Sequence, residues 1–121
     1  MSYEFYKILH ITGVIMTFIG LAGVLAVKMT APELPARPRR LFFLTHGLGL
    51  LIALVAGFGL AARLQMFQNL PGWVWAKIGI WIILGGAVAV AKRRGQLGGP
   101  LLTVFIAFGA CAAWLAITKP F

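Results

Sequence analysis

Acidic residues are almost missing from this sequence. Of 121 residues only two are acidic, Glu4 and Glu33, and charged residues make up 11% of the chain. There is one cysteine, Cys111, and one asparagine, Asn69. A catalytic carboxylate pair, an internal disulfide and a cysteine-based zinc site are therefore excluded. No phosphate-binding glycine loop or catalytic triad motif is present either.

The remaining residues are mostly apolar. Hydrophobic residues make up 61% of the chain, and the mean hydropathy is +0.96, values that an ordinary soluble domain does not reach. Four segments approach the roughly 20 apolar residues that a helix needs to cross a bilayer. They are Phe5–Val27, Leu41–Ala62, Trp73–Ala91 and Pro100–Ile117. The sequence therefore predicts an integral membrane protein.

Three polar segments separate these spans. The first, Lys28–Arg40, has three prolines and four cations, so we expect it to continue neither neighbouring helix. The second is Arg63–Gly72, and the third is Lys92–Gly99, which precedes Pro100 in a predicted first helical turn. Because such short loops place each helix beside its predecessor, we predict an all-α fold: one antiparallel bundle of four transmembrane helices over residues 1–121, without a soluble domain.

The positive charges indicate how the bundle is oriented. Seven cations lie in the first and third loops, namely Lys28, Arg37, Arg39, Arg40, Lys92, Arg93 and Arg94. Three lie at the opposite ends of the spans, namely Lys7, Arg63 and Lys119. The positive-inside rule then places both basic loops in the cytoplasm and both termini outside it. The net charge of +9 is thus interpreted as contact with the lipid bilayer and not with nucleic acid, and a bacterial inner membrane is expected.

Aromatic residues are expected to mark the two membrane boundaries. Eight lie near the proposed outer boundary, namely Tyr3, Phe5, Tyr6, Phe67, Trp73, Trp75, Trp114 and Phe121, and Phe42 and Phe43 lie near the inner one. Trp81, near the middle of its span, is the exception. Its ring is expected either to pack in the core or to contact a flat ligand.

His10 and His46 are the only histidines, and each lies about five residues inside a predicted span. An unpaired polar group in hydrocarbon costs several kcal/mol, and ligation of haem iron would give each imidazole a reason to be there. Because the two helices run in opposite directions, their Cα layers should be roughly 15 to 20 Å apart. We therefore expect two separate metal ligands and not one iron held by both rings of a monomer.

Cations near His10 point to a polar site in the outer layer. Lys77 is expected at the depth of His10, where its ammonium would snorkel to the interface, neutralise a porphyrin propionate or hold a substrate. Arg63, at the outer end of its helix, is a candidate second cation. The second axial ligand of iron is left open among Lys77, water, a partner chain and a symmetry mate.

Small residues follow each histidine at helical spacing. The two stripes are His10, Gly13, Thr17 and Gly20, and His46, Gly49, Ala53 and Gly57. Such stripes serve close helix packing in membranes, but a groove beneath a histidine is also what a macrocycle needs. Gly13, Gly20 and Gly49 are therefore candidate cofactor-binding positions. In a parallel homodimer, Gly13 and Gly20 would line an interface that brings His10 of both copies to one haem.

Two segments resemble a known family. Residues 6–23, YKILHITGVIMTFIGLAG, resemble the first helix of HemJ-type protoporphyrinogen oxidases and of the related small membrane families of the SirB and CopD kind. Residues 75–81, WAKIGIW, are similar to the HemJ stretch that carries a lysine. The resemblance implies that His10 is the haem-linked histidine and Lys77 the matching lysine. The proline-rich loop replaces the arginine- and histidine-bearing segment of HemJ-type proteins, so the resemblance implies haem b or porphyrin binding and leaves enzymatic activity open.

Two functions are consistent with these observations. The first is a membrane haem-b-binding protein with a redox or electron-transfer role, and the second is a non-catalytic accessory or scaffold subunit of a larger membrane complex. Small multidrug exporters are disfavoured because no span contains a carboxylate. Fluoride-channel-like proteins are disfavoured because the one asparagine, Asn69, lies in a loop.

Overall fold

The computed structural model describes residues 2–30, 36–94 and 98–120, and within these ranges it contains four α-helices and no strand. They are α1 (Tyr3–Thr30), α2 (Ala36–Arg63), α3 (Gly72–Arg93) and α4 (Gly99–Thr118). Each helix is long and apolar enough to cross a membrane. The predicted all-α, four-span architecture is confirmed, and the chain is a multi-pass membrane protein. Phe121 lies outside the described residues.

The helices are slightly longer than the spans predicted from hydropathy. The largest difference is at the first loop, where α1 continues to Thr30 and α2 already begins at Ala36, so that the helix includes Pro38. The expectation that all of Lys28–Arg40 is non-helical was therefore wrong. Proline is tolerated there because the first N–H groups of a helix have no intrahelical partner. Pro100 occupies the first turn of α4, as predicted.

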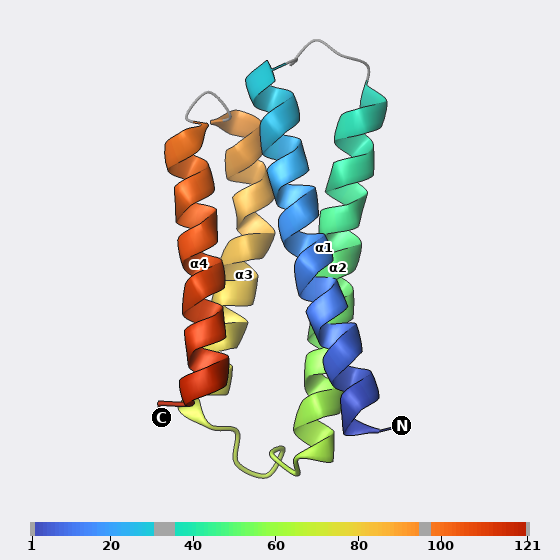
Figure 1. Cartoon of the computed structure of the whole chain (residues 1–121), viewed down its shortest axis with the longest axis vertical. Coiled ribbons are helices and arrows are strands. Elements are labelled where there is room, and N and C mark those ends of the chain that lie inside the picture. Colours follow the sequence, from blue (N-terminus) through green and yellow to red (C-terminus); the bar gives the residue numbers. More distant parts are fainter. Residues whose placement is uncertain (1, 31–35, 95–97, 121) are drawn as a thin grey trace.

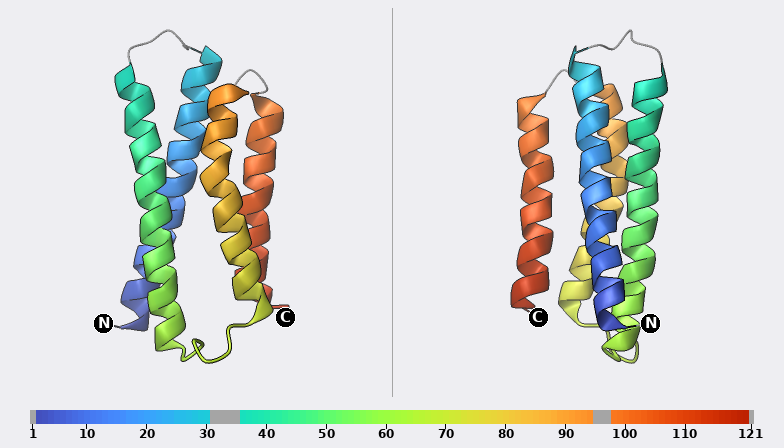
Figure 2. Two further views of the ribbon diagram at one scale, coloured as in Figure 1. Left: turned by 180° about the vertical axis from the view of Figure 1, so that it is seen from behind. Right: turned by 45° about the vertical axis from the view of Figure 1, so that its right-hand side comes forward.

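The bundle consists of two antiparallel hairpins, α1–α2 and α3–α4 (Figure 1). The beginning of α1 and the end of α4 lie at one end of the bundle, which we call the terminal end. The beginnings of α2 and α4 lie at the other, which we call the basic end because the arginines and lysines of the first and third loops flank it. The α1–α2 pair is packed most intimately, whereas α4 packs mainly on α3, at the edge of the bundle (Figure 2).

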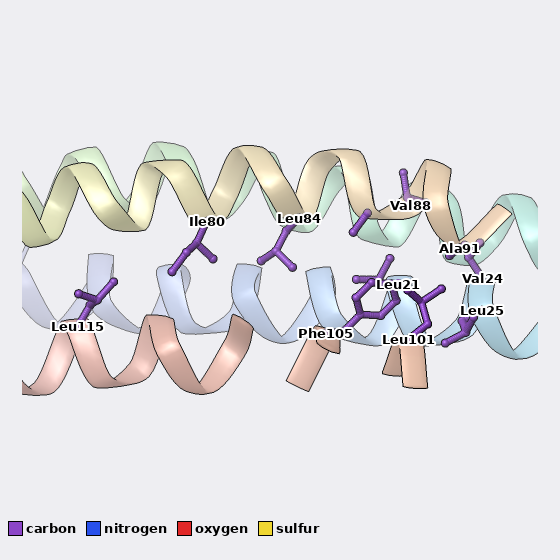
Figure 3. Packing of buried hydrophobic residues seen from close by; sticks show 11 residues of the cluster. Leu21, Val24, Leu25, Ile80, Leu84, Val88, Ala91, Leu101, Phe105 and Leu115 are labelled. Carbon is purple, nitrogen blue, oxygen red and sulfur yellow. The ribbon is translucent and has the colours of Figure 1, made fainter. Parts of the chain in front are cut away.

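The hydrophobic core lies where α1, α3 and α4 meet (Figure 3). Its fully buried members on α1 are Leu21, Val24 and Leu25. They pack with leucine, isoleucine, valine and alanine side chains of α3 and with Phe105 of α4. Burial of this cluster attaches the α3–α4 hairpin to α1, the helix that carries His10.

The outer surface of the bundle is also apolar. Large side chains are exposed along every helix, for example Ile8 on α1, Leu51 on α2, Ile82 on α3 and Ile106 on α4. Such an outward-facing surface suits hydrocarbon and not water. Cys111 is exposed on α4 as well.

Candidate functional site

The small-residue stripes form the contact between α1 and α2. A Cβ atom built on Gly13 would lie 2.6 Å from the backbone nitrogen of Ala53, and one on Gly49 would lie 2.5 Å from that of Thr17. A Cβ on Gly20 would collide with the backbone of His46. The partner backbone thus fills the space above all three glycines. The predicted groove for a macrocycle is not there, because these glycines allow the two helix backbones to pack against each other and fill the space.

His46 is sealed in this contact. Its side chain is 1% exposed, and its Nδ1–H donates a hydrogen bond to the Thr17 carbonyl oxygen of α1 over 2.8 Å. The other ring nitrogen, Nε2, is buried and has no hydrogen-bond partner within the described structure. Buried polar atoms are nearly always paired, so this nitrogen needs an explanation.

His10 repeats the arrangement from the opposite helix. Its Nδ1–H donates to the Ala53 carbonyl oxygen of α2, also over 2.8 Å. Unlike His46, it is only partly buried. Its ring rests against Gly57, where an added Cβ would come within 3.3 Å of Cε1 and Nδ1. The ring is therefore held by a backbone acceptor and a glycine, with part of it facing outward.

The two hydrogen bonds determine which nitrogen of each neutral ring is protonated. A carbonyl oxygen can only accept, so Nδ1 must carry the proton and Nε2 must carry the lone pair. Metal-binding histidines commonly donate their second ring N–H to a carbonyl oxygen in this way, which fixes the ring and its tautomer. Both His10 and His46 are thus oriented as a metal ligand requires.

The histidines occupy separate depths, as the sequence predicted. Gly20 packs against the backbone of His46, and it lies ten residues beyond His10 on α1. At a rise of about 1.5 Å per residue the two Cα layers are about 15 Å apart. Within the described ranges, no three His, Cys, Asp or Glu residues cluster in a way that could hold a metal ion. Each histidine could therefore supply one ligand to a metal, and the chain contains no multidentate site among these residues.

Two lysines accompany His10 but not His46. Lys77 on α3 and Lys7 on α1 lie near enough to His10 for their charges to reach its ring. Lys77 is half-buried, whereas Lys7 is exposed and donates a hydrogen bond to the Tyr3 hydroxyl over 3.1 Å. The terminal end thus gathers three basic groups.

Arg63 is not brought into this group by any described contact. It is exposed at the end of α2, and among the described residues its side chain makes no hydrogen bond or ion pair. Trp81 is accounted for by packing, because its Nε1–H donates to the Leu50 carbonyl oxygen over 2.9 Å and so ties α3 to α2. A ligand-stacking role for Trp81 would have to coexist with this bond.

The carbonyl oxygens that accept hydrogen bonds from the histidines were not predicted from the sequence, although the spacing of residues could have indicated them. Thr17 follows His10 by seven residues, and Ala53 follows His46 by seven. In the antiparallel α1–α2 pair, each histidine bonds to the residue that lies seven positions after the other histidine. The repeat continues further, since Gly23 faces the ring of Phe42 and Gly59 faces the ring of Tyr6. Helices α1 and α2 are thus two copies of one pattern, displaced by 36 positions and related by an approximate two-fold axis.

His10 is better suited than His46 to be an axial ligand of haem iron. Both histidines have the right donor chemistry, because each Nε2 carries a free lone pair. Space differs, because Nε2 of His46 has no exposed surface while His10 is partly exposed beside Gly57 and Lys77. Gly13 and Gly20, buried against α2, are not available to line an interface between two copies of the chain.

Comparison with known proteins adds no relative. No family model matches the chain, and neither curated proteins nor solved structures give a match.

Proposed function

We propose that this protein binds haem b in the membrane and has a redox or electron-transfer role, with His10 as an axial ligand. The observation that carries the proposal is that the His10 ring is partly exposed while its Nδ1–H donates to the Ala53 carbonyl oxygen over 2.8 Å. The hydrogen bond holds the ring in the tautomer that presents a lone pair on Nε2. The enclosed His46 makes the same hydrogen bond, so the exposure of the His10 ring is what favours it as the ligand.

The surrounding charges support an anionic macrocycle. Lys7 and Lys77 both act on His10, and the only acidic residue at the terminal end is Glu4. Cations inside a membrane protein are costly unless they are paired or reach water, and the propionates of haem would supply the missing negative charge. The macrocycle itself would supply one-electron chemistry. The protein would hold its iron through His10, neutralise its charge through Lys77 and Lys7, and exclude water with the apolar bundle.

His46 is proposed as a second ligand, although its Nε2 is not accessible in this arrangement of the helices. Its Nε2 has the correct tautomer and no partner, yet α1 and α2 leave no space in front of it. Binding there would require neighbouring helices to separate. The two histidines therefore act independently, and loss of one should leave the other's contribution largely intact.

An absorption spectrum of the detergent-purified protein tests the proposal. After expression with ample haem, the protein should show a Soret band and the reduced α-band of b-type haem. His10→Ala should remove most of the signal, and His46→Ala should leave most of it. Colourless but folded wild-type protein would contradict haem binding.

A colourless result would favour the second candidate, a non-catalytic subunit of a larger membrane complex. One observation supports this alternative. Gly13, Gly20 and Gly49 all lie in the contact between α1 and α2, as expected for a hairpin whose role is purely structural. Under this alternative, His10→Ala would change only stability, and the protein would co-purify with a large apolar partner from its native membrane.

A further inference from the structure

A pocket lies at the basic end of the bundle, and neither histidine lines it. It has a volume of about 200 Å³ and is lined by Arg39, Arg40, Phe43 and Lys92. The first three belong to the beginning of α2 and the last to the final turn of α3. Two helices that contact each other little elsewhere thus contribute three cations to one concave site.

The cations of this pocket have no negative partner among the described residues. Lys92 Nζ lies 4.0 Å from the centre of the Phe43 ring, so the aromatic face positions the ammonium over the pocket. Of the two acidic residues in the chain, Glu4 is at the terminal end and only Glu33 belongs to the basic loops, against seven cations there. One carboxylate leaves most of that charge uncompensated.

The side chains match a phosphate group. Arginine presents a planar fork of N–H donors that fits phosphate oxygens, and lysine adds a compact charge. The site also lies near the N-terminal end of α2, which is the positive end of the helix dipole. Basic pockets between transmembrane helices on the cytoplasmic side are known to hold anionic lipid headgroups.

The depth of the pocket points to a lipid as the source of the phosphate. Phe43 is 38% exposed, and Leu41 and Leu44 beside it are 62% and 59% exposed. The cations therefore lie one helical turn from a surface that faces hydrocarbon. A lipid could place its phosphate between Arg39, Arg40 and Lys92 while its acyl chains run along α2. A free phosphate ion would use the cations but not this apolar surface.

We infer that Arg39, Arg40, Phe43 and Lys92 form a binding site for the phosphate of an anionic lipid headgroup at the cytoplasmic membrane surface predicted for the basic end. The site is independent of haem binding. It would hold the N-terminal end of α2 and the C-terminal end of α3 together, where little protein contact does so.

Lipid retention by the intact protein tests this inference. The full chain, reconstituted in equimolar phosphatidylglycerol and phosphatidylcholine, is extracted and its bound lipids are counted by native mass spectrometry. Wild-type protein should retain phosphatidylglycerol in preference to phosphatidylcholine. Arg39→Gln with Lys92→Gln should reduce the affinity by about a hundredfold, since each charge-assisted hydrogen bond to the phosphate contributes roughly tenfold.

The matched control removes the same charge from the same end. Arg93 and Arg94 are exposed and do not line the pocket, so Arg93→Gln with Arg94→Gln should retain the preference within about threefold. Equal losses in the two double variants would overturn the site, because general attraction would then suffice. Release of the bound lipid by millimolar inorganic phosphate would overturn the assignment to a lipid. Circular dichroism of each variant, together with Lys92→Arg as a charge-preserving variant that should bind normally, separates loss of binding from loss of fold.

Discussion

The two histidine layers have the same hydrogen bond in different surroundings. In both, Nδ1–H donates over 2.8 Å to a carbonyl oxygen of the opposite helix. His46 is enclosed and its Nε2 has no partner among the described residues, whereas His10 is partly exposed and has two lysines nearby. The orientation of the ring therefore does not distinguish a ligand from a packing residue. Space and charge around the free nitrogen do.

The difference arises although α1 and α2 repeat one pattern. Each helix supplies a histidine, a glycine three residues later and an acceptor carbonyl seven residues later. The α3–α4 hairpin breaks this symmetry because it packs on α1 much more than on α2. It places Lys77 beside His10 and its leucine-rich core beside the C-terminal half of α1. Asymmetric packing thus gives two similar histidines different environments.

The orientation of the two layers in the membrane gives an all-or-none test. In a Cys111→Ala background, Arg93→Cys should not react with a membrane-impermeant maleimide added from outside the cell, whereas Lys119→Cys should react. The reason is the excess of cations at the basic end. Labelling at position 93 alone would place His10, and not His46, nearer the cytoplasm.

The glycine contacts on which both layers depend should be sensitive to a single methyl group. Gly20→Ala forces a Cβ into the backbone of His46 and should lower the free energy of unfolding by about 3 kcal/mol. Gly47 on α2 is the control, because it lies outside the helix contact and an added Cβ there meets nothing within 4 Å. Gly47→Ala should stabilise α2 by roughly 0.5 to 1 kcal/mol. Similar results for the two variants in reversible unfolding experiments would disprove the close contact.

Replacing each histidine with alanine should lower the free energy of unfolding more at the buried His46 than at the partly exposed His10. His46→Ala should cost about 2 to 3 kcal/mol because it leaves a cavity and removes a hydrogen bond. His10→Ala should cost about 1 kcal/mol because lipid or water can fill the space of a partly exposed ring. His46→Leu, which fills the cavity and removes the orphaned nitrogen, should recover most of the loss. Unfolding of the haem-free protein measures all three, and a greater cost at His10 would reverse the comparison.

Lys77 should show opposite effects on stability and on haem binding. Lys77→Met removes a half-buried cation near Lys7, so the haem-free protein should gain up to about 1 kcal/mol of stability. Haem affinity should fall about tenfold because a propionate loses its partner, while Lys77→Arg should retain it. Haem titration and thermal unfolding are measured on the same samples. No change in either quantity would indicate that Lys77 snorkels to the interface instead.

The smallest expected effect is at Gly57, which supports the His10 ring alone. Gly57→Ala places a Cβ 3.3 Å from Cε1 and Nδ1, so the ring must move by a few tenths of an ångström. Stability should fall by less than about 1 kcal/mol. The Soret band should shift in position without being lost. An unchanged spectrum, with haem bound, would show that His10 is not the ligand.

Much of the fold could be predicted from the sequence because hydrophobic length is a one-dimensional property. Four apolar runs separated by short polar segments specify four spanning helices and their antiparallel order. The depth of each histidine also follows, since residue position and rise per residue determine it. The helix ends were less predictable at Lys28–Arg40, because proline is unfavourable inside a helix but tolerated in its first turn.

What the glycines and histidines contact depends on how the helices pack against one another. As a sequence pattern, Gly13, Gly20 and Gly49 suit a helix contact and a cofactor groove equally well. The close approach of the α1 and α2 backbones makes them a helix contact. The carbonyl acceptors at Thr17 and Ala53 belong to the backbone, which every residue shares, so their role depends on helix register and not on residue type. Residue positions along the apolar runs were enough to predict that the two histidines lie in the membrane at different depths. The packing of α1 against α2 encloses His46, and the packing of α3 against α1 brings Lys77 near His10, because burial and charge proximity depend on which helices meet in space.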